Sequence, residues 1–172
     1  MPARGIAERL PNLEVTMNAL SEIIATNPFF ANLSPEHLDI FAGCATEAQF
    51  NADQIVFQEG EPANQFYLIE SGRVAVEAHQ PSDGTVLVQI LGPGDMLGWS
   101  WLFPPFAWHF RARALEPTNA IVLNGAHLLI AAERKRDFGY ELMKRVAQVV
   151  IHRLQATRKQ LLDQQIESAL EG

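Results

Sequence analysis

The sequence predicts an α+β fold in which a region of short strands lies between helical segments. Over residues 6–26, apolar residues recur at three- and four-residue steps, the pattern of one helix face. Over 49–124, short β-branched and aromatic segments alternate with glycine- and proline-containing turns. Helical periodicity returns from about residue 126. At least six strands spaced by about ten residues favour a sandwich or a barrel.

The N-terminal part predicts two helices. The first ends at Asn27-Pro28, because proline disfavours helical backbone at the residue before it. Ser34 is expected to cap a second helix, with Pro35 at its first position. His37 falls on the polar side of this second helix and is expected at the surface. The apolar side of the second helix would carry Leu38, Phe41 and Ala45.

A long helix is predicted from about Phe138 to about Leu170, after a short helix over 127–134. Its apolar residues follow a heptad pattern, which is typical of a helix that pairs with a second copy. We therefore predict a homodimer through this helix, although packing of the whole helix on its own domain remains the alternative. The seam would consist of Tyr140, Met143, Ala147, Val150, Leu154, Thr157 and Leu161.

The chain has 172 residues and a net charge of 13 − 20 = −7, which argues against nonspecific binding to nucleic acid or anionic membranes. Its single cysteine, Cys44, is expected to be a small buried residue, and it allows no intramolecular disulfide. The sequence shows no secretory signal and no apolar run long enough for a membrane helix. We expect a cytoplasmic protein with no membrane contact.

A spaced motif carries a family resemblance. Its first half is Phe50-x4-Ile55-x4-Gly60-x5-Phe66-Tyr67-x-Ile69-x2-Gly72-x-Val74-x-Val76, and its second half is Leu91-Gly92-Pro93-Gly94-Asp95-x-Leu97-Gly98. The chain resembles the cyclic-nucleotide-binding domain family, the sensor module of catabolite-activator-type regulators, over about residues 28–160. The family places tight turns at Gly60, Gly72, Gly94 and Gly98, where positive φ or close backbone approach requires glycine.

The resemblance implies a double-stranded β-helix, a jelly-roll-like β-roll, flanked by N-terminal helices and a long C-terminal helix. The domain organisation follows from it. We expect an N-terminal helical segment at 1–27, the β-roll domain at 28–137 and the long, dimerising helix at 138–172. It also implies a regulatory, non-enzymatic role in signal transduction through ligand sensing.

The second half of the motif departs from the family. The resemblance implies a glutamate for the ribose hydroxyl at position 99 and an arginine for the cyclic phosphate at position 108, yet both positions hold tryptophan. An indole cannot pair with a phosphate as a guanidinium does. We therefore expect an aromatic pocket that does not bind cAMP or cGMP in the usual way. Its candidate residues are Leu97, Gly98, Trp99, Ser100, Trp101, Trp108, His109 and Arg111.

Three alternatives remain open. A genuine cyclic-nucleotide regulator would use Arg111, or backbone amides near Gly98, for the phosphate. A ligand-free interaction or scaffold domain would fill the pocket with its own tryptophans. An enzyme on a cupin-like scaffold would need clustered metal ligands, whereas the five histidines are scattered along the chain: His37, His79, His109, His127 and His152.

The expected partners follow from these interpretations. Enzyme motifs such as a Walker loop or a nucleophile elbow are missing, so we expect no enzyme, no metal and no cofactor, with a cyclic nucleotide as the one possible exception. Catabolite-activator-type regulators continue into a helix-turn-helix domain, and the sequence ends at Gly172 without one. We expect a homodimer with a small-molecule or protein partner and no DNA-binding domain.

Overall fold

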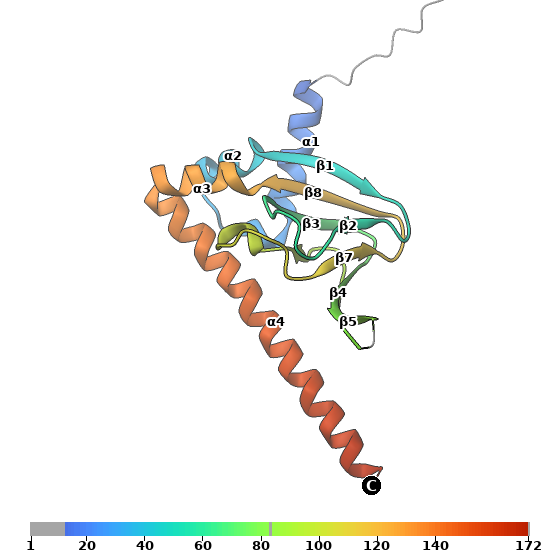
Figure 1. Cartoon of the computed structure of the whole chain (residues 1–172). Coiled ribbons are helices and arrows are strands. Elements are labelled where there is room, and N and C mark those ends of the chain that lie inside the picture. Colours follow the sequence, from blue (N-terminus) through green and yellow to red (C-terminus); the bar gives the residue numbers. More distant parts are fainter. Residues whose placement is uncertain (1–12, 83, 172) are drawn as a thin grey trace, which may run out of the picture.

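The computed structural model describes residues 13–82 and 84–171. Helices α1 and α2 and the short helix η1 precede the strands, and α3 and α4 follow them (Figure 1). A short helix, η2, lies between β6 and β7. The helical elements are α1 (Leu13–Thr26), η1 (Pro28–Phe30), α2 (Pro35–Ala42), η2 (Ser100–Leu102), α3 (Gly125–Arg134) and α4 (Arg136–Leu170). The first part of the expected helix, residues 6–12, lies outside the described residues.

Eight strands in the described part of the chain form two four-stranded sheets with all pairs antiparallel, which confirms the predicted jelly-roll-like β-roll. The strand order is β1-β8-β3-β6 in one sheet and β2-β7-β4-β5 in the other. The strands are β1 (Ala45–Phe50), β2 (Ile55–Phe57), β3 (Gln65–Ser71), β4 (Val74–Gln80), β5 (Gly84–Leu91), β6 (Met96–Leu97), β7 (Arg111–Ala114) and β8 (Thr118–Asn124).

The core lies between the two sheets and continues under the helices. Central strands β3 and β8 supply fully buried side chains such as Phe66, Leu68 and Ile121. The rings of Phe41 and Phe138 lie 5.2 Å apart and join α2 to the start of α4. Burial of these aromatic and branched side chains is the main stabilising contribution to such a fold.

The glycine turns have the backbone that the motif requires. Gly72 has a φ of 89°, and a Cβ there would lie 2.3 Å from the hydroxyl oxygen of Thr118. No other residue fits that position without moving the start of β8.

Two local expectations were wrong. Helix α2 ends at Ala42, and Ala45 is the first residue of β1, paired with Leu123 of β8. His37 is buried, with 8% of its surface exposed, and its Nε2 lies 3.0 Å from Oδ2 of Asp137. The N-terminus of α4 covers the side of α2 that the sequence pattern assigned to solvent, so a long-range contact overrides the local amphipathic pattern.

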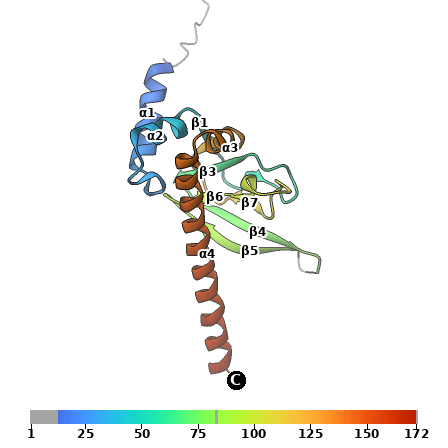
Figure 2. The same cartoon turned by 90° about the vertical axis from the view of Figure 1, so that its left-hand side faces the viewer.

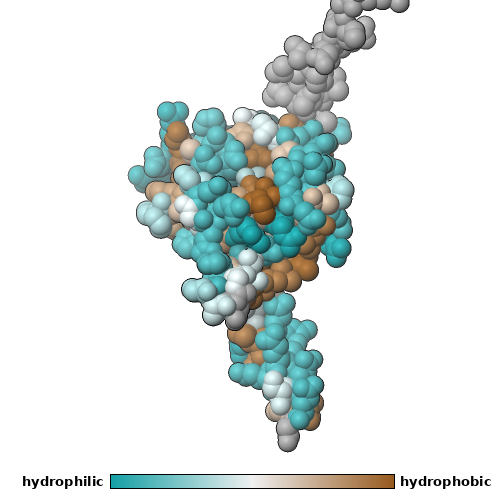
Figure 3. Space-filling view, turned by 45° about the vertical axis from the view of Figure 1, so that its right-hand side comes forward, coloured by the Kyte–Doolittle hydropathy of each residue, from teal (hydrophilic) through white to brown (hydrophobic). Residues whose placement is uncertain are grey.

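Helix α4 starts against the roll and then leaves it, as two views at right angles show (Figure 2). Phe138, Leu142 and Val146 are buried, whereas every described residue from Leu154 onward is exposed. At 1.5 Å per residue, its 35 residues span about 52 Å. Hydrophobic surface gathers at the lower edge of the globular part and continues in patches along the projecting helix (Figure 3).

Candidate functional site

A cavity of about 320 Å³ lies between the β-roll and α4. Its volume falls in the range of small-molecule sites, about 300–1,000 Å³. Its walls are mostly aromatic and aliphatic. The lining residues are Phe57, Val76, Val88, Gln89, Leu97, Gly98, Trp99, Ser100, Trp108, His109, Phe110, Val150, Arg153, Leu154 and Thr157.

Trp108 forms one wall of this cavity. Its ring stacks on Phe57 with centroids 3.9 Å apart and 13° between the planes, and it is 6% exposed. The same indole covers Gly98, where a Cβ would lie 2.6 Å from Cζ3 of Trp108. Trp108 therefore fills the space next to the turn that carries Gly98.

Trp101 lies outside the cavity. It is 1% exposed and stacks on Phe66 at 5.2 Å, and its indole nitrogen donates to the carbonyl oxygen of Gly98 at 3.3 Å. A Cβ at Gly125, the first residue of α3, would lie 2.7 Å from the Trp101 ring. Trp101 is thus part of the core that joins η2 to α3.

Arg111 also lies outside the cavity. Its guanidinium donates to Oε2 of Glu77 at 2.6 and 2.9 Å, and Arg113 donates to the other oxygen at 2.8 Å. The hydrogen bond from Arg113 is the main reason that the pKa of Glu77 lies below its usual range, although burial opposes this effect. Arg111 is therefore held on the outer side of its sheet by an ion pair.

Trp99 contacts a residue outside the set predicted from the sequence. The guanidinium of Arg153, on α4, lies over the Trp99 ring at 4.6 Å from its centroid. Burial lowers the pKa of Arg153 to about 10, and the negative charge of Asp95 opposes that effect. The guanidinium is therefore still charged at neutral pH. Helical spacing in the sequence could have indicated that Arg153 faces the roll, because position 153 continues the core-facing series Phe138, Leu142, Val146 and Val149.

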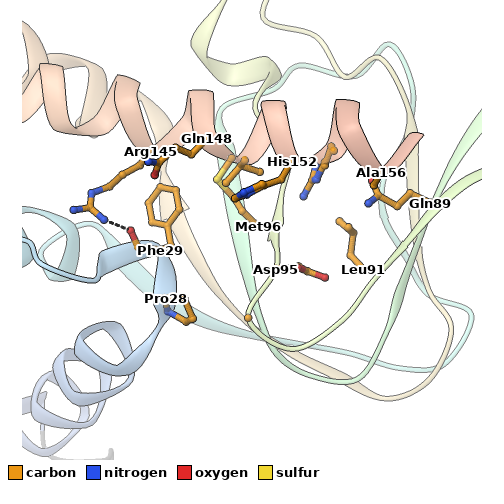
Figure 4. Close-up of a pocket in the computed structure, with 13 residues that line it drawn as sticks. Pro28, Phe29, Gln89, Leu91, Asp95, Met96, Arg145, Gln148, His152 and Ala156 are labelled. Atoms are coloured by element: carbon orange, nitrogen blue, oxygen red, sulfur yellow. Dashed lines mark hydrogen bonds between the residues drawn. The ribbon is translucent and has the colours of Figure 1, made fainter. Parts of the chain in front are cut away.

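A second cavity of about 410 Å³ adjoins the first, and Gln89 and Arg153 line both. In Figure 4, Gln148, His152 and Ala156 of α4 lie on one side of it, Asp95, Met96 and Leu91 of the roll lie on the other, and Arg145 extends toward Phe29. Arg145 is engaged elsewhere, because its guanidinium donates to the carbonyl oxygens of Phe29 at 2.6 Å and Ala31 at 2.8 Å.

The structure thus brings six of the eight expected pocket residues to one cavity and places Trp101 and Arg111 elsewhere. Within it, the hydroxyl of Ser100 lies 3.1 Å from Nδ1 of His109. Cys44 does not line the cavity, and burial raises the pKa of its thiol to about 11, so the thiol stays protonated at neutral pH. Cys44 therefore does not supply a thiolate nucleophile to this cavity.

The glycine turns at Gly60, Gly72, Gly94 and Gly98 lie in a segment that matches a known protein family. The model for the cyclic nucleotide-binding domain matches residues 47–135, just over half of the chain. The chain belongs to the cyclic nucleotide-binding domain family. Domains of this family are regulatory and typically non-enzymatic.

Curated relatives of this cyclic nucleotide-binding domain include the CRP-like cAMP-activated global transcriptional regulator of Mycobacterium tuberculosis (strain H37Rv). The two are 27% identical over 144 residues, which is 84% of this chain and 62% of the relative. The domain thus spans about three fifths of the length of that regulator.

Solved structures show the same fold. A putative cyclic nucleotide-binding protein from Geobacter metallireducens is 30% identical, with a TM-score of 0.70 over 78% of this chain and 97% of that one. A cyclic nucleotide-binding domain from Methylobacillus flagellatus is 21% identical, with a TM-score of 0.72 over 86% and 83% of the two chains.

Metal clusters and membrane-spanning helices are both missing from the described part of the chain. Within residues 13–82 and 84–171, no group of three or more His, Cys, Asp and Glu side chains is placed to hold a metal ion. Over the same ranges, no helix has both the length and the apolar character that crossing a bilayer requires.

Proposed function

We propose that this cyclic nucleotide-binding domain is a non-enzymatic, cytoplasmic sensor that does not bind cAMP or cGMP in the usual way. The observation that carries the proposal is the packing of Trp108 against Gly98 and Phe57. The family resemblance calls for a phosphate-binding arginine at position 108. An indole provides neither charge nor paired donors for a phosphate there.

The two alternative phosphate ligands are poorly placed. Arg111 is held by Glu77, so turning inward would leave the carboxylate with fewer charged partners at a site with 7% side-chain exposure. The helix that follows Gly98 is η2, which has only three residues and offers a small dipole. Both observations support a ligand other than a conventionally bound cyclic nucleotide.

Pairing of α4 with a second copy is part of the same proposal. The predicted seam residues are distributed along α4, and three of them, Val150, Leu154 and Thr157, also line the 320 Å³ cavity. A ligand in the cavity would contact the surface that a second helix would cover. Occupancy and helix pairing would then be coupled, provided that the ligand binds one helix arrangement more tightly than the other.

A ligand-free scaffold is the second candidate, because the buried indole of Trp108 fills the space next to Gly98 at the wall of the cavity. The remaining volume of about 320 Å³ and its charged edge favour a sensor over this candidate.

Calorimetric titration of the full chain with cAMP, cGMP and cyclic di-GMP to millimolar concentration tests the proposal. We expect no saturable heat. Saturable binding of cAMP or cGMP would overturn the proposal. If nucleotide binding were then lost in Arg111→Met, Arg111 would be established as the phosphate ligand.

A further inference from the structure

Arg153 lines both cavities, and its guanidinium carbon lies over the Trp99 ring at 4.6 Å from the ring centroid. The N–H donors of a guanidinium lie in its own plane and point outward from its edge. A guanidinium whose face covers an aromatic ring can therefore still donate to an anion that approaches its edge. Arg153 is half-buried, and it makes no hydrogen bond or ion pair with any residue that the structure describes. The side chain is therefore held in place by stacking, with its donors free.

The charged groups around Arg153 leave it without a direct counter-ion among the described residues. Asp95 faces the same cavity, but its carboxylate accepts the backbone N–H of Gly92 at 2.8 Å and is not within ion-pair distance of Arg153. Arg145 is bound to two carbonyl oxygens and lies 3.5 Å from Glu141. A partly desolvated cation without a paired carboxylate favours binding of an anion, because the anion restores the interactions lost with water.

The rest of the 320 Å³ cavity sets the shape of a ligand. Trp99, Trp108 and Phe110 line it from the roll, and Val150 and Leu154 line it from α4. Such walls suit a planar apolar group. Arg153 is the one arginine or lysine among the described residues that line it, so a single negative charge is matched and a polyphosphate is not.

We propose that Arg153 and Trp99 form the anion-binding end of this cavity, and that its ligand is an organic monoanion with a planar apolar body. The inference rests on the proposed function in taking the cavity between the roll and α4 as the ligand site. It adds the chemical class of the ligand and names Arg153 as the residue that binds the negative charge of the ligand.

The test compares two probes that share one ring system. 2-Naphthoate carries a carboxylate, and 2-naphthamide is its uncharged counterpart. Calorimetric titration of the full chain should show saturable binding of 2-naphthoate and binding of 2-naphthamide that is about tenfold weaker or more, the usual effect of removing one charge-assisted hydrogen-bonded pair.

Variants then assign the effect to Arg153. Arg153→Met keeps an unbranched apolar stem and should weaken 2-naphthoate about tenfold while leaving 2-naphthamide unchanged. Arg153→Lys keeps the charge without the planar fork and should fall between wild type and Arg153→Met. Arg158→Met is the matched control, since Arg158 is exposed on the same helix and lines neither cavity.

The inference is overturned if 2-naphthoate does not bind, or if Arg153→Met binds it as the wild type does. Neither result bears on the proposal that cAMP and cGMP are not bound in the usual way, because the separate nucleotide titrations test that proposal. If Arg153→Met does not fold, Arg153→Lys provides the same test, because a lysine above its pKa carries no charge. The inference is then overturned if Arg153→Lys, at such a pH, still prefers 2-naphthoate over 2-naphthamide as strongly as the wild type does.

Discussion

The indole of Trp108 lies against Gly98, in the space where the side chain of any other residue at position 98 would begin. A Cβ at position 98 would lie 2.6 Å from Cζ3 of Trp108. Gly98 also has a φ of 89°, a backbone conformation that L-residues rarely adopt. Position 98 is thus restricted twice, by its own backbone and by a tryptophan ten residues later in the chain.

Gly98→Ala should lower the free energy of unfolding by more than the backbone cost alone. We expect about 2–4 kcal/mol in urea denaturation, the sum of a positive-φ penalty and an overpacking term. Gly94→Ala is the matched control, because Gly94 has a φ of 88° and a Cβ added there would meet no described atom within 4 Å. If the two variants lost the same free energy of unfolding, the contact with Trp108 would make no contribution to the cost of Gly98→Ala.

Glu77 joins Arg111 and Arg113 on the outer side of one sheet. Glu77→Gln should cost about 2 kcal/mol at neutral pH, because it removes the charge that both guanidiniums contact. Glu116→Gln is the control, since its pair with Arg73 is exposed and should contribute less than about 1 kcal/mol.

The cost of Glu77→Gln should depend on pH in one direction. The pKa of Glu77 is lowered from its ordinary value of 4.5, so its stabilising effect is fully present above pH 4.5 and is lost as pH falls through the folded-state pKa. Denaturation curves of wild type and variant should therefore converge at acidic pH. A difference that stays constant from neutral to strongly acidic pH would contradict this assignment.

Arg145 joins α4 to the segment around η1. Arg145→Met should lower the free energy of unfolding by about 2 kcal/mol, since two charged hydrogen bonds to carbonyl oxygens are lost. Amide hydrogen exchange should speed up over residues 28–33. Lys144→Met is the control, because Lys144 is exposed and its ion pair is with Glu141 on its own helix. Unchanged exchange over 28–33 would show that α4 does not hold this segment.

Leu161 tests the helix pairing without touching the cavity, whereas Leu154 lines it. Leu161→Glu and Leu154→Glu should each convert a dimer into a monomer in light scattering, because a buried seam does not accommodate a carboxylate. Gln155→Glu adds the same charge at an exposed position outside the heptad seam and should leave the dimer intact. A Leu161→Glu dimer as stable as wild type would place the seam elsewhere.

Local sequence signals were sufficient for most elements of the fold. The Asn27-Pro28 stop, the Ser34 cap and the glycine turns each act through the backbone of a few neighbouring residues, and the structure has α1 ending at Thr26 and Ser34 accepting from the His37 backbone N–H. His37 and Ala45 were misplaced, because the start of α4 and the partner strand β8 come from more than 75 residues away.

Residue type and spacing were enough to predict a sandwich or barrel of short strands and the long helix, and the family resemblance specified the β-roll and the two family positions that hold tryptophan. The folded chain was needed to distinguish the core tryptophan, Trp101, from those that line the cavity, and to show that Arg111 faces Glu77 and that Arg153 meets Trp99. Each of these depends on which distant side chains share a space, and periodicity along one segment does not specify the partner across the cavity.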